Sequence, residues 1–470
     1  MIETLNSECF CVSLDPGALR HALEADPAAR GLSRLIEERC PNLFAALPVF
    51  VSRQGVEAMA SVIGAVEEVV ALPAYRAEAL AGAPATALHD SGARGVFLGY
   101  DFHIGPQGPR LIEINTNAGG ALLNAVLGRA QRACCEDVAR LVSGPIPPDR
   151  LERAFFDMFA EEWDAAGRAG LPRRIAIVDD SPAQQFLYPE FLLFAQLFRR
   201  FGAEASVLAP EQLTFVSGEL RDTGGRVGLV YNRMTDFALG DPAHAPIREA
   251  YLSGAAVVTP HPRAHALYAD KRNLAILTDE VRLRRWGVRE ETIAVLLGGI
   301  PRTEIVSRAD AERLWSDRRR LFFKPAAGHG SKAAYRGDKL TRRVWSEILD
   351  GRYVAQERVP AGERQISAGT ALKTDIRNYV YAGEVQLLAA RLYQGQTTNM
   401  RTVGGGFAPV LTTPASVESD RMECTAHAEP AQPIGPRRPR QAGSARIEPL
   451  SPGCPTADAS TTSPPPGAAS

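Results

Sequence analysis

One short segment constrains the fold of this chain more than any other. The run Leu-Ile-Glu-Ile-Asn-Thr occupies residues 111–116, and on a strand residues two apart face the same side, so Glu113 and Asn115 can contact one ligand together. Asp101 lies twelve positions before Glu113, and the intervening Gly-Pro-Gln-Gly-Pro at 105–109 is a strong turn signal. We therefore predict an antiparallel hairpin that brings these three polar side chains to one site.

The side chains on this hairpin indicate a cation site. Two carboxylates and an amide, from Asp101, Glu113 and Asn115, are oxygen ligands suited to a hard cation such as Mg²⁺. Gly119 and Gly120 follow the strand and let backbone approach a ligand closely. A surface hairpin with ordinary polar residues is the alternative that the residues leave open.

The composition excludes several classes of protein. The chain has 470 residues, enough for two or three domains, and its 53 Lys and Arg residues balance 54 Asp and Glu. This balance gives no reason to expect nucleic acid or an anionic membrane as a partner. We find no signal-peptide pattern and no run of about 18 apolar residues, so we expect no membrane-spanning helix. Seven scattered cysteines, an odd number, favour reduced thiols and a cytoplasmic location.

Changes in hydrophobic pattern divide the chain into four expected parts. A largely helical region that contains the hairpin comes first, and a section with a β-α-β rhythm follows it. A section of strands and glycine-rich loops is third, and a tail rich in Pro, Ser, Ala, Gly and Thr is last. The tail has too few large apolar residues to offset chain entropy, so we expect it to be disordered. The expected bounds are 1–172, 173–260, 261–413 and 414–470.

The pattern within these parts predicts individual elements. Apolar residues at helical spacing indicate helices, and runs rich in β-branched residues between turn signals indicate strands. Two of the later strands form an expected hairpin around Gly383. The expected helices are 55–70, 121–142, 151–166 and 188–201, and the expected strands are 48–51, 174–180, 204–208, 227–231, 257–260, 321–325, 353–359, 375–381 and 385–391.

The β-α-β section offers candidate substrate contacts. Open α/β sheets bind ligands beyond the carboxyl ends of their strands, and Arg233 and Asp236 follow the strand expected at 227–231. We expect these two residues, together with Tyr100 and the loops after Asp180, to set specificity. A salt-bridged surface turn explains Arg233 and Asp236 equally well.

A lysine and a glycine-rich loop follow the strand expected at 321–325. Lys324 supplies a point charge for a phosphate, and Gly328 and Gly330 free backbone N–H groups to point at an anion, to which Ser331 adds a hydroxyl. The loop is not a P-loop, because G-x-x-x-x-G-K-[ST] is absent. Lys271 offers a second cation. The alternatives are a flexible surface loop and a solvated lysine.

Two later strands add to this candidate nucleotide site. Adenine recognition needs one backbone donor and one acceptor beside apolar walls, and Gln356–Val359 can supply them, with Glu357 accepting a ribose hydroxyl. Arg391 ends an otherwise uncharged apolar strand, where a guanidinium can hold phosphoryl or carboxylate oxygens in a fixed fork. A salt bridge from Arg391 to Asp375 or Glu384 is the alternative.

In combination these pieces resemble the ATP-grasp superfamily. That family orders a phosphate lysine, Lys-Pro with a glycine-rich loop, a Gln/Glu hinge, Asp-x-Arg, a catalytic Arg, an Asn-containing loop with glycines and finally Asp…Glu-x-Asn. Here the last element stands first, so the chain is similar, over residues 45–412, to the circularly permuted glutathione synthetases of eukaryotic type. The matching residues in chain order are Lys271, Lys324-Pro325, Gly328–Lys332, Gln356-Glu357, Asp375-Ile376-Arg377, Arg391 and Asn399 with Gly404–Gly406.

The resemblance implies an α+β ATP-grasp fold, circularly permuted, with an inserted Rossmann-like α/β substrate domain. It also implies a carboxylate–amine ligase that uses ATP and Mg²⁺, forms an acyl phosphate and an amide, and releases ADP. Its partners would be a small-molecule acid and amine, not nucleic acid or a membrane, and a homodimer is left open. The implied site is Asp101, Glu113 and Asn115 for metal, Lys271, Lys324, Gly328, Gly330, Ser331, Gln356, Glu357 and Val359 for ATP, Arg391 for catalysis, and Arg233, Asp236 and Asn399 for substrate.

Two departures qualify the resemblance. Glutathione synthetases have a metal-binding Glu four residues after the lysine of Lys-Pro, whereas this chain has Gly328, so the hairpin alone, or the hairpin with Asp375, would bind the metal. The contacts specific to glutathione are not recognisable. The missing acid motivates an alternative, a non-catalytic ATP-binding scaffold or regulator. A dinucleotide site in residues 174–260 ranks low, because no G-x-G-x-x-G follows the first strand there.

Overall fold

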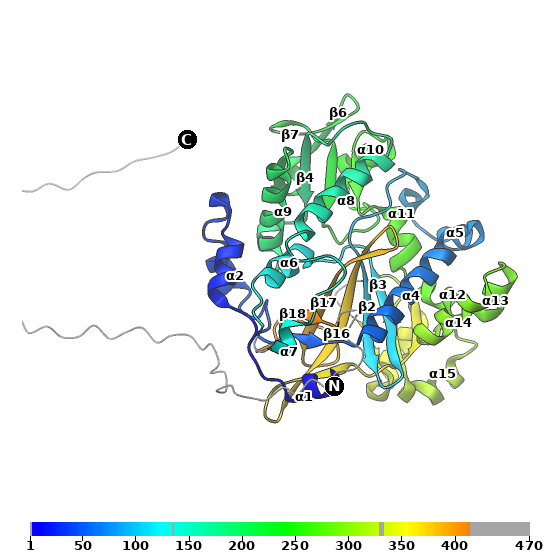
Figure 1. Ribbon diagram of the computed structural model, residues 1–470. Helices are drawn as coiled ribbons and strands as arrows, with labels where there is room; N and C mark the ends of the chain where they lie inside the picture. Colours follow the sequence, from blue (N-terminus) through cyan, green and yellow to red (C-terminus); the bar gives the residue numbers. More distant parts are fainter. Residues whose placement is uncertain (1, 134–135, 329–332, 414–470) are drawn as a thin grey trace, which may run out of the picture. The chain divides into compact units, whose positions relative to one another are not determined.

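The computed structural model describes residues 2–133, 136–328 and 333–413, and a central sheet holds its parts together (Figure 1). The strand order of this sheet is β1-β18-β17-β16-β2-β3, with β15 paired to β16. The predicted hairpin, β2 and β3, lies antiparallel beside β16, although more than half the chain separates them. The bounds are β1 Val49–Phe50, β2 Leu98–Gly105, β3 Gly108–Asn115, β15 Gly362–Ser367, β16 Thr370–Tyr381, β17 Glu384–Tyr393 and β18 Gly406–Leu411.

A β-bulge in the hairpin decides which side chains share a face. Asp101 pairs with Glu113, but the next residue of β2, Phe102, pairs with Leu111, so Ile112 is an extra residue in β3. Leu111 and Ile114 consequently both join the apolar core, while Ile112 and Glu113 line the opposite side. Gly108 closes the turn with φ 91°, a left-handed conformation that glycine adopts without steric cost.

Helix α4, Arg53–Val70, confirms the helix predicted at 55–70 and covers the apolar face of the hairpin. Ser52 caps its N-terminus, because the Ser52 hydroxyl accepts a 3.0 Å hydrogen bond from the N–H of Gly55. The buried face of the helix consists of Gly55, Met59, Val62, Ile63, Ala65, Val66, Val69 and Val70.

The Ser52 cap allows a direct measurement of how much α4 stabilises the fold. We expect Ser52→Ala to lower the free energy of unfolding by about 1 kcal/mol, because one N–H of the first turn loses its partner. Urea unfolding followed by circular dichroism measures this loss. Ser61, an exposed serine within the same helix, is the matched control, and Ser61→Ala should not destabilise the protein. Equal stability of the wild type and Ser52→Ala would contradict the capping role.

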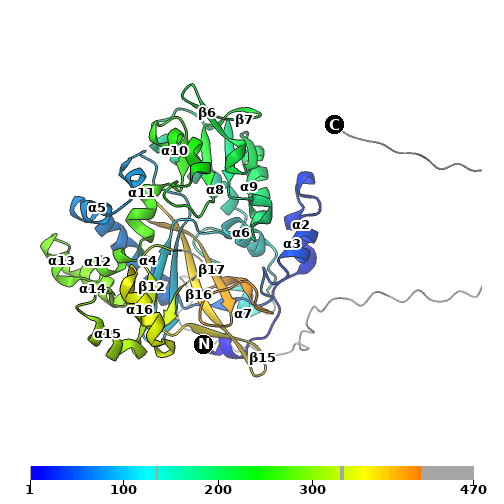
Figure 2. The same ribbon diagram turned by 180° about the vertical axis from the view of Figure 1, so that it is seen from behind.

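A small antiparallel sheet, ordered β11-β14-β12-β13, carries the predicted Lys-Pro strand. Helix α16, Arg342–Asp350, lies over it and can be followed from behind in Figure 2, and the Trp345 ring meets Phe323 edge-on at 5.4 Å. This sheet has its own apolar core, which also contains Leu314 and Ile348. The bounds are β11 Thr303–Ile305, β12 Leu321–Pro325, β13 Tyr335–Arg336, β14 Tyr353–Glu357 and α15 Ala311–Asp317.

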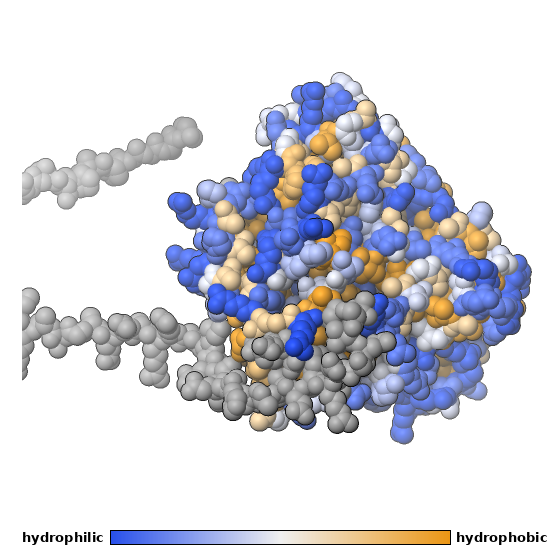
Figure 3. All heavy atoms as spheres, in the orientation of Figure 1, coloured by the Kyte–Doolittle hydropathy of each residue, from blue (hydrophilic) through white to orange (hydrophobic). Residues whose placement is uncertain are grey.

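The surface shows no extended apolar face in the view of Figure 3, where polar side chains alternate with small groups of apolar ones. Among the residues that the structure describes, no helix combines the length and the apolar character needed to cross a membrane. The helices outside the β-α-β section and the segment 121–142 also include α1 Ile2–Glu8, α2 Pro16–Leu23, α3 Leu32–Arg39, α5 Pro73–Leu80, α11 Pro262–Ala264, α12 Arg272–Leu277, α13 Glu280–Arg285 and α14 Glu290–Gly299.

The predicted β-α-β section forms a parallel sheet ordered β10-β9-β4-β5. Helix α9 connects β4 to β5, as the pattern predicts. A small antiparallel sheet between β5 and β9 was not predicted. The bounds are α8 Leu151–Ala165, β4 Arg174–Val178, α9 Tyr188–Arg200, β5 Glu204–Leu208, β6 Thr214–Val216, β7 Glu219–Asp222, β8 Gly225–Arg226, β9 Leu229–Asn232, α10 Ala245–Leu252 and β10 Val257–Thr259.

The helix predicted at 121–142 is wrong in its second half. Helix α6 comprises only Ala121–Arg129, and a short helix α7, Glu136–Ala139, follows after a break. Within the break Gln131 pairs with Leu14 of the N-terminal segment in an isolated antiparallel β-bridge, so the helix does not continue there. The sequence pattern also missed β15, which pairs only with β16, and β18, which lies between β1 and β17 in the central sheet. The expected disorder of 414–470 lies outside the described residues.

Candidate functional site

A cavity of about 290 Å³ opens where the hairpin, the sheet β11-β14-β12-β13 and strands β16 and β17 meet. Most of its lining residues are polar, and they come from segments far apart in the sequence. The cavity brings together most of the predicted nucleotide and metal residues, but neither Asp101 nor Arg233 nor Asp236 lines it. The predicted residues that line it are Glu113, Asn115, Lys271, Lys324, Gly328, Gln356, Glu357, Val359, Arg391 and Asn399.

Asp101 is fully buried, at 0% exposure, and two arginines hold its carboxylate. Nε and Nη2 of Arg377 donate to Oδ1 and Oδ2, both at 2.7 Å, and Nη2 of Arg391 lies 2.8 Å from Oδ2. Burial opposes the ionised form, but the two guanidiniums outweigh it and lower the pKa of Asp101 to about 2. The carboxylate is therefore ionised and engaged by arginines at neutral pH.

Arg391 bridges two buried carboxylates. Besides contacting Asp101, its Nε donates to Oδ1 of Asp375 at 2.6 Å, and Oδ2 of Asp375 accepts from the Thr398 hydroxyl. Burial alone would lower the pKa of Arg391, but Asp101 and Asp375 raise it, so its charge is permanent. Arg391 therefore forms the salt bridge to Asp375 and also lines the cavity. The sequence left these two roles open as alternatives.

Glu113 and Asn115 provide the donor set that fits a divalent cation. Nδ2 of Asn115 donates to Asp101 Oδ2 at 3.0 Å and to Glu113 Oε1 at 3.2 Å, so its Oδ1 is the atom left to bind a cation. Asp101 does not fit the same role, because a cation would reach it only by displacing an arginine. Among the described residues, no group of three or more His, Cys, Asp and Glu side chains is arranged to hold a metal ion.

Lys324 reaches the cavity from β12, and hydrogen bonds to two neutral oxygens fix the position of its ammonium. Its Nζ donates to the carbonyl of Ile112, which the β-bulge presents, and to Oε1 of Gln356, both at 2.8 Å. Gln356 is in turn held by the Thr303 hydroxyl at 3.1 Å. Burial lowers the pKa of Lys324 to about 8, so it is mainly protonated at neutral pH, with one N–H left for a phosphate.

The predicted glycine-rich loop begins at the cavity wall. Nζ of Lys271 lies 3.3 Å from the carbonyl of Gly328, and the N–H of Lys271 donates to the carbonyl of Ala326. Lys271 therefore enters the cavity beside the start of the loop. Gly330 and Ser331, predicted phosphate contacts, lie outside the described residues.

A histidine that was not predicted, His103, contacts the strand end expected to recognise a purine, Gln356–Val359. His103 Nδ1 lies 2.9 Å from the carbonyl of Val359, and since a carbonyl only accepts, Nδ1 carries the proton and Nε2 is an acceptor. Burial lowers the pKa of His103, which keeps it neutral. Among the described residues the N–H of Val359 has no hydrogen-bond partner, which leaves it as a donor for a base. The position of His103, two residues after Asp101 on one strand face, was the available signal.

Asn399 shapes a loop rather than reaching across the cavity. Its Nδ2 donates to the carbonyl of Gln394 at 2.7 Å, and its Oδ1 accepts from the N–H of Arg401 and the hydroxyl of Thr402. The loop so closed adds lining residues that were not predicted. These are Gln396, Thr397, Thr398 and Met400, to which Arg377 and Tyr393 of the neighbouring strands are added.

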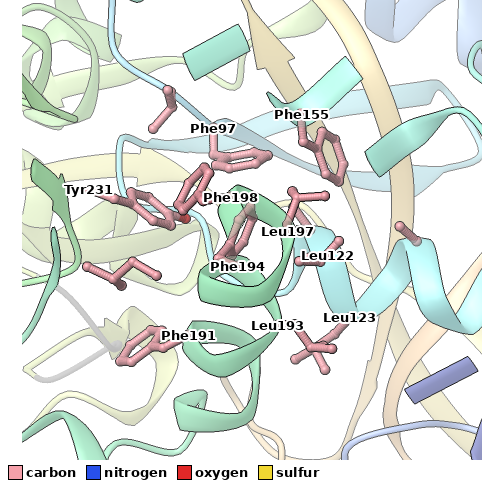
Figure 4. Packing of buried hydrophobic residues seen from close by; sticks show 14 of the residues in the cluster. Phe97, Leu122, Leu123, Phe155, Phe191, Leu193, Phe194, Leu197, Phe198 and Tyr231 are labelled. Atoms are coloured by element: carbon pink, nitrogen blue, oxygen red, sulfur yellow. The ribbon is translucent and has the colours of Figure 1, made fainter. Parts of the chain in front are cut away.

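Arg233 lies outside the cavity but is joined to the end of β3. It is buried, its Nη1 donates to Oδ1 of Asn117, and Asn117 returns a 2.9 Å hydrogen bond to the carbonyl of Arg233. Its guanidinium lies over the rings of Tyr231 and Phe191, at 5.3 and 5.7 Å. Figure 4 labels these two rings among the buried hydrophobic residues. The buried Nε of Arg233 has no hydrogen-bond partner among the described residues.

Asp236 and Tyr100 are occupied by other contacts. Oδ2 of Asp236 lies 2.8 Å from Nδ1 of His244, whose Nε2 lies 2.9 Å from Oδ1 of Asp180, so the histidine clamps the loops after β4 and β9. This is the geometry of a salt-bridged turn. Tyr100 is fully buried and donates to Glu67 of α4 at 2.8 Å. Their predicted roles in specificity stay predictions.

No protein-family model matches the sequence, and no curated protein matches it. A glutathione synthetase-like effector from Globodera pallida is similar in structure, with 10% identity and a TM-score of 0.49 over 85% of this chain and 98% of that one. A gamma-glutamylcysteine synthetase-like protein from Methylobacillus flagellatus has 11% identity and a TM-score of 0.43 over 76% and 87%. D-alanyl-alanine synthetase A from Vibrio cholerae has 10% identity and a TM-score of 0.30 over 48% and 68%. The mixed α+β architecture expected from the sequence is present in the helices and sheets of this structure itself.

Proposed function

We propose that this chain is an ATP-dependent carboxylate–amine ligase of the ATP-grasp type. The observation that carries the proposal is the composition of one cavity, in which Lys271, Lys324 and Arg391 face Glu113 and Asn115. Cations of this kind bind phosphate oxygens, and a carboxylate beside an amide oxygen suits the divalent cation that accompanies ATP. A purely structural cavity has no need of three cationic side chains.

In the proposed reaction the carboxylate of the acid attacks the γ-phosphorus of ATP, and ADP leaves. The amine then attacks the acyl carbon, phosphate departs with the electron pair, and the nitrogen loses a proton. Lys324 and Lys271 bind phosphate oxygens, and Arg391 stabilises the oxygens that gain charge in the transition state. Glu113 and Asn115 would hold a divalent cation, which when bound neutralises charge on the phosphates.

The hinge supports a purine base. The free N–H of Val359 is a donor for a ring nitrogen, and Glu357, which lines the cavity, is placed to accept a ribose hydroxyl. Nε2 of His103 adds an acceptor beside the hinge. These contacts suit ATP better than a phosphate ligand without a base.

The arrangement of strands supports the proposal of a permuted chain. The hairpin that ends the ATP-grasp motif order is paired here with β16, beside Arg377, although it precedes that strand in sequence. We further propose that residues 173–260 form the substrate domain and that Arg233 contributes to the binding of the acid substrate. The expected division at 172, 260 and 413 belongs to the same proposal.

A screen of paired acids and amines with Mg-ATP tests the proposal. We expect release of phosphate and ADP, not AMP, with a matching amide product in the mass spectrum, for at least one pair. Arg391→Met should lose this activity, whereas Arg343→Met, at an arginine whose side chain is 90% exposed, should retain it. ATP consumption that yields AMP would contradict the proposed reaction.

A non-catalytic ATP-binding protein is the second candidate. Two observations favour it: Gly328 stands where an acidic ligand is expected, and the arginines leave Asp101 unavailable to a cation. This candidate predicts ATP binding without phosphate release for any acid and amine. Detection of an amide product would exclude it.

The affinity for ATP is expected to fall as the pH rises through about 8. The pKa of Lys324 is lowered to about 8 by burial, so its ammonium is charged below that pH and neutral above it. Calorimetric titration with an unhydrolysable ATP analogue on either side of pH 8 measures the effect. Lys324→Met should show a flatter profile, and a wild-type affinity that stays constant across pH 8 would contradict a phosphate contact by Lys324.

A further inference from the structure

Four buried side chains form a row of alternating charge across three neighbouring strands. Asp101 on β2 is paired in register with Arg377 on β16, and Asp375 on β16 is paired with Arg391 on β17. Arg391 then reaches back across β16 to Asp101, 2.8 Å away. Asp101 is thus the residue that joins the two ion pairs into one unit.

The two arginines use the same atoms for these bonds. Each donates through Nε and Nη2, Arg377 to Asp101 alone and Arg391 to Asp375 and Asp101. The Nη1 group of each has no hydrogen-bond partner among the described residues, and both arginines line the cavity. The carboxylates therefore occupy one edge of each guanidinium and leave the other edge for a ligand.

We infer that Asp101 is a positioning residue, which holds Arg377 and Arg391 as a paired fork for an oxyanion, and that it is not a cation ligand. This inference deepens the proposed function and rests on it. The cation then depends on Glu113 and Asn115, which line the cavity where Asp101 does not. The Asn115 amide connects the two subsites, because its Nδ2 contacts both Asp101 and Glu113.

Positioning and simple electrostatics predict opposite results for Asp101→Asn. Removing a negative charge makes the cavity more positive, so a charge effect alone would tighten the binding of an anion. The amide that replaces the carboxylate has one acceptor oxygen for three arginine N–H groups, so the fork loses its fixed geometry. Positioning therefore predicts weaker anion binding.

Metal-free binding of tripolyphosphate, measured by calorimetry with EDTA present, separates the two subsites. We expect Asp101→Asn to weaken this binding about tenfold, the effect of about one charge-assisted hydrogen bond, and Glu113→Gln not to weaken it. With Mg²⁺ and an unhydrolysable ATP analogue the order reverses. Glu113→Gln should raise the Mg²⁺ concentration needed for half-saturation about tenfold, and Asp101→Asn should leave it within about twofold of the wild type.

Arg377→Gln gives a second route to the same answer, because it leaves Asp101 held by Arg391 and Asn115. It should weaken tripolyphosphate binding and leave the Mg²⁺ requirement unchanged. Tighter or unchanged tripolyphosphate binding in Asp101→Asn, or a Mg²⁺ requirement raised as in Glu113→Gln, would overturn the inference. Failure of the wild-type protein to bind either ligand would instead count against the proposed function.

Discussion

Lys324→Met is expected to reduce ATP-dependent phosphate release at least about 100-fold, the usual effect of removing one charge-stabilising group from a transition state. Lys324 is buried, and its ammonium has a single N–H that is not bonded to any residue that the structure describes. The methionine fills a similar volume but cannot contact a phosphate. The loss should fall on both nucleotide affinity and turnover, because the same charge faces the phosphates in both states.

The same substitution should not destabilise the protein. Burial lowers the pKa of Lys324 from 10.5 to about 8, so the unfolded chain binds this proton more tightly than the folded protein does. The free energy of unfolding of the wild type therefore rises with pH between about 8 and 10.5, and below pH 8 the buried charge costs on the order of 3 kcal/mol. Methionine removes this cost, offset by the lost hydrogen bonds to Ile112 and Gln356.

Activity and stability are therefore measured on the same preparations, with phosphate release and urea unfolding. Lys339→Met is the matched control, since Lys339 is exposed and lies away from the cavity. It should change neither quantity. Full activity of Lys324→Met would remove Lys324 from the mechanism, and a large loss of stability would show that the charge is compensated by contacts other than those described.

Arg364→Met is expected to lower the free energy of unfolding by about 3–5 kcal/mol, because several backbone carbonyls lose a charged donor worth about 1.5–3 kcal/mol each, a loss partly offset by relief of the burial that lowers the pKa of Arg364 to about 10. Arg364 has 0% exposure, and all of its hydrogen bonds go to backbone carbonyls. Nε donates to Pro48, Nη1 to Asn6 and Gln365, and Nη2 to Cys9, at 2.5–2.8 Å. Its loss removes a donor from each of these carbonyls, two of which, on Pro48 and Cys9, belong to buried residues.

Arg364 fastens the N-terminal segment to β15, so its effect extends beyond one side chain. Urea unfolding measures the loss, and hydrogen exchange should show residues 2–12 opening more readily in Arg364→Met than in the wild type. Arg343→Met is the control for the loss of an exposed guanidinium and should change stability by less than about 0.5 kcal/mol. A change below about 1 kcal/mol for Arg364→Met would mean that water or other donors replace its contacts.

The elements that could be predicted from the sequence are those specified by local pattern. The hairpin follows from its turn residues and from two strands of apolar residues, and α4 follows from apolar residues at helical spacing after Ser52. The parallel strands follow from β-branched runs separated by a helix. Glu113 and Asn115 were placed in one site because the period of a strand puts them on one face.

What the pattern did not predict depends on pairing between distant segments. Asp101 meets Arg377 only because β2 pairs with β16, and no local signal reports that a carboxylate will be engaged by an arginine 276 positions away. The break after α6 likewise depends on Leu14, which pairs with Gln131 from another part of the chain. The strand face on which a candidate ligand lies can therefore be predicted from the sequence, whereas its neighbours on other strands cannot.

The β-bulge at Ile112 has a consequence for how a nucleotide would bind. Its carbonyl holds the ammonium of Lys324, so the small sheet is fastened to the hairpin by the same group that faces a phosphate. One N–H of the ammonium is still available, so a phosphate can be bound without undoing this bond. The two walls of the cavity are thus joined before any ligand arrives, and the entropy lost in bringing them together is lost during folding and need not be lost again on binding.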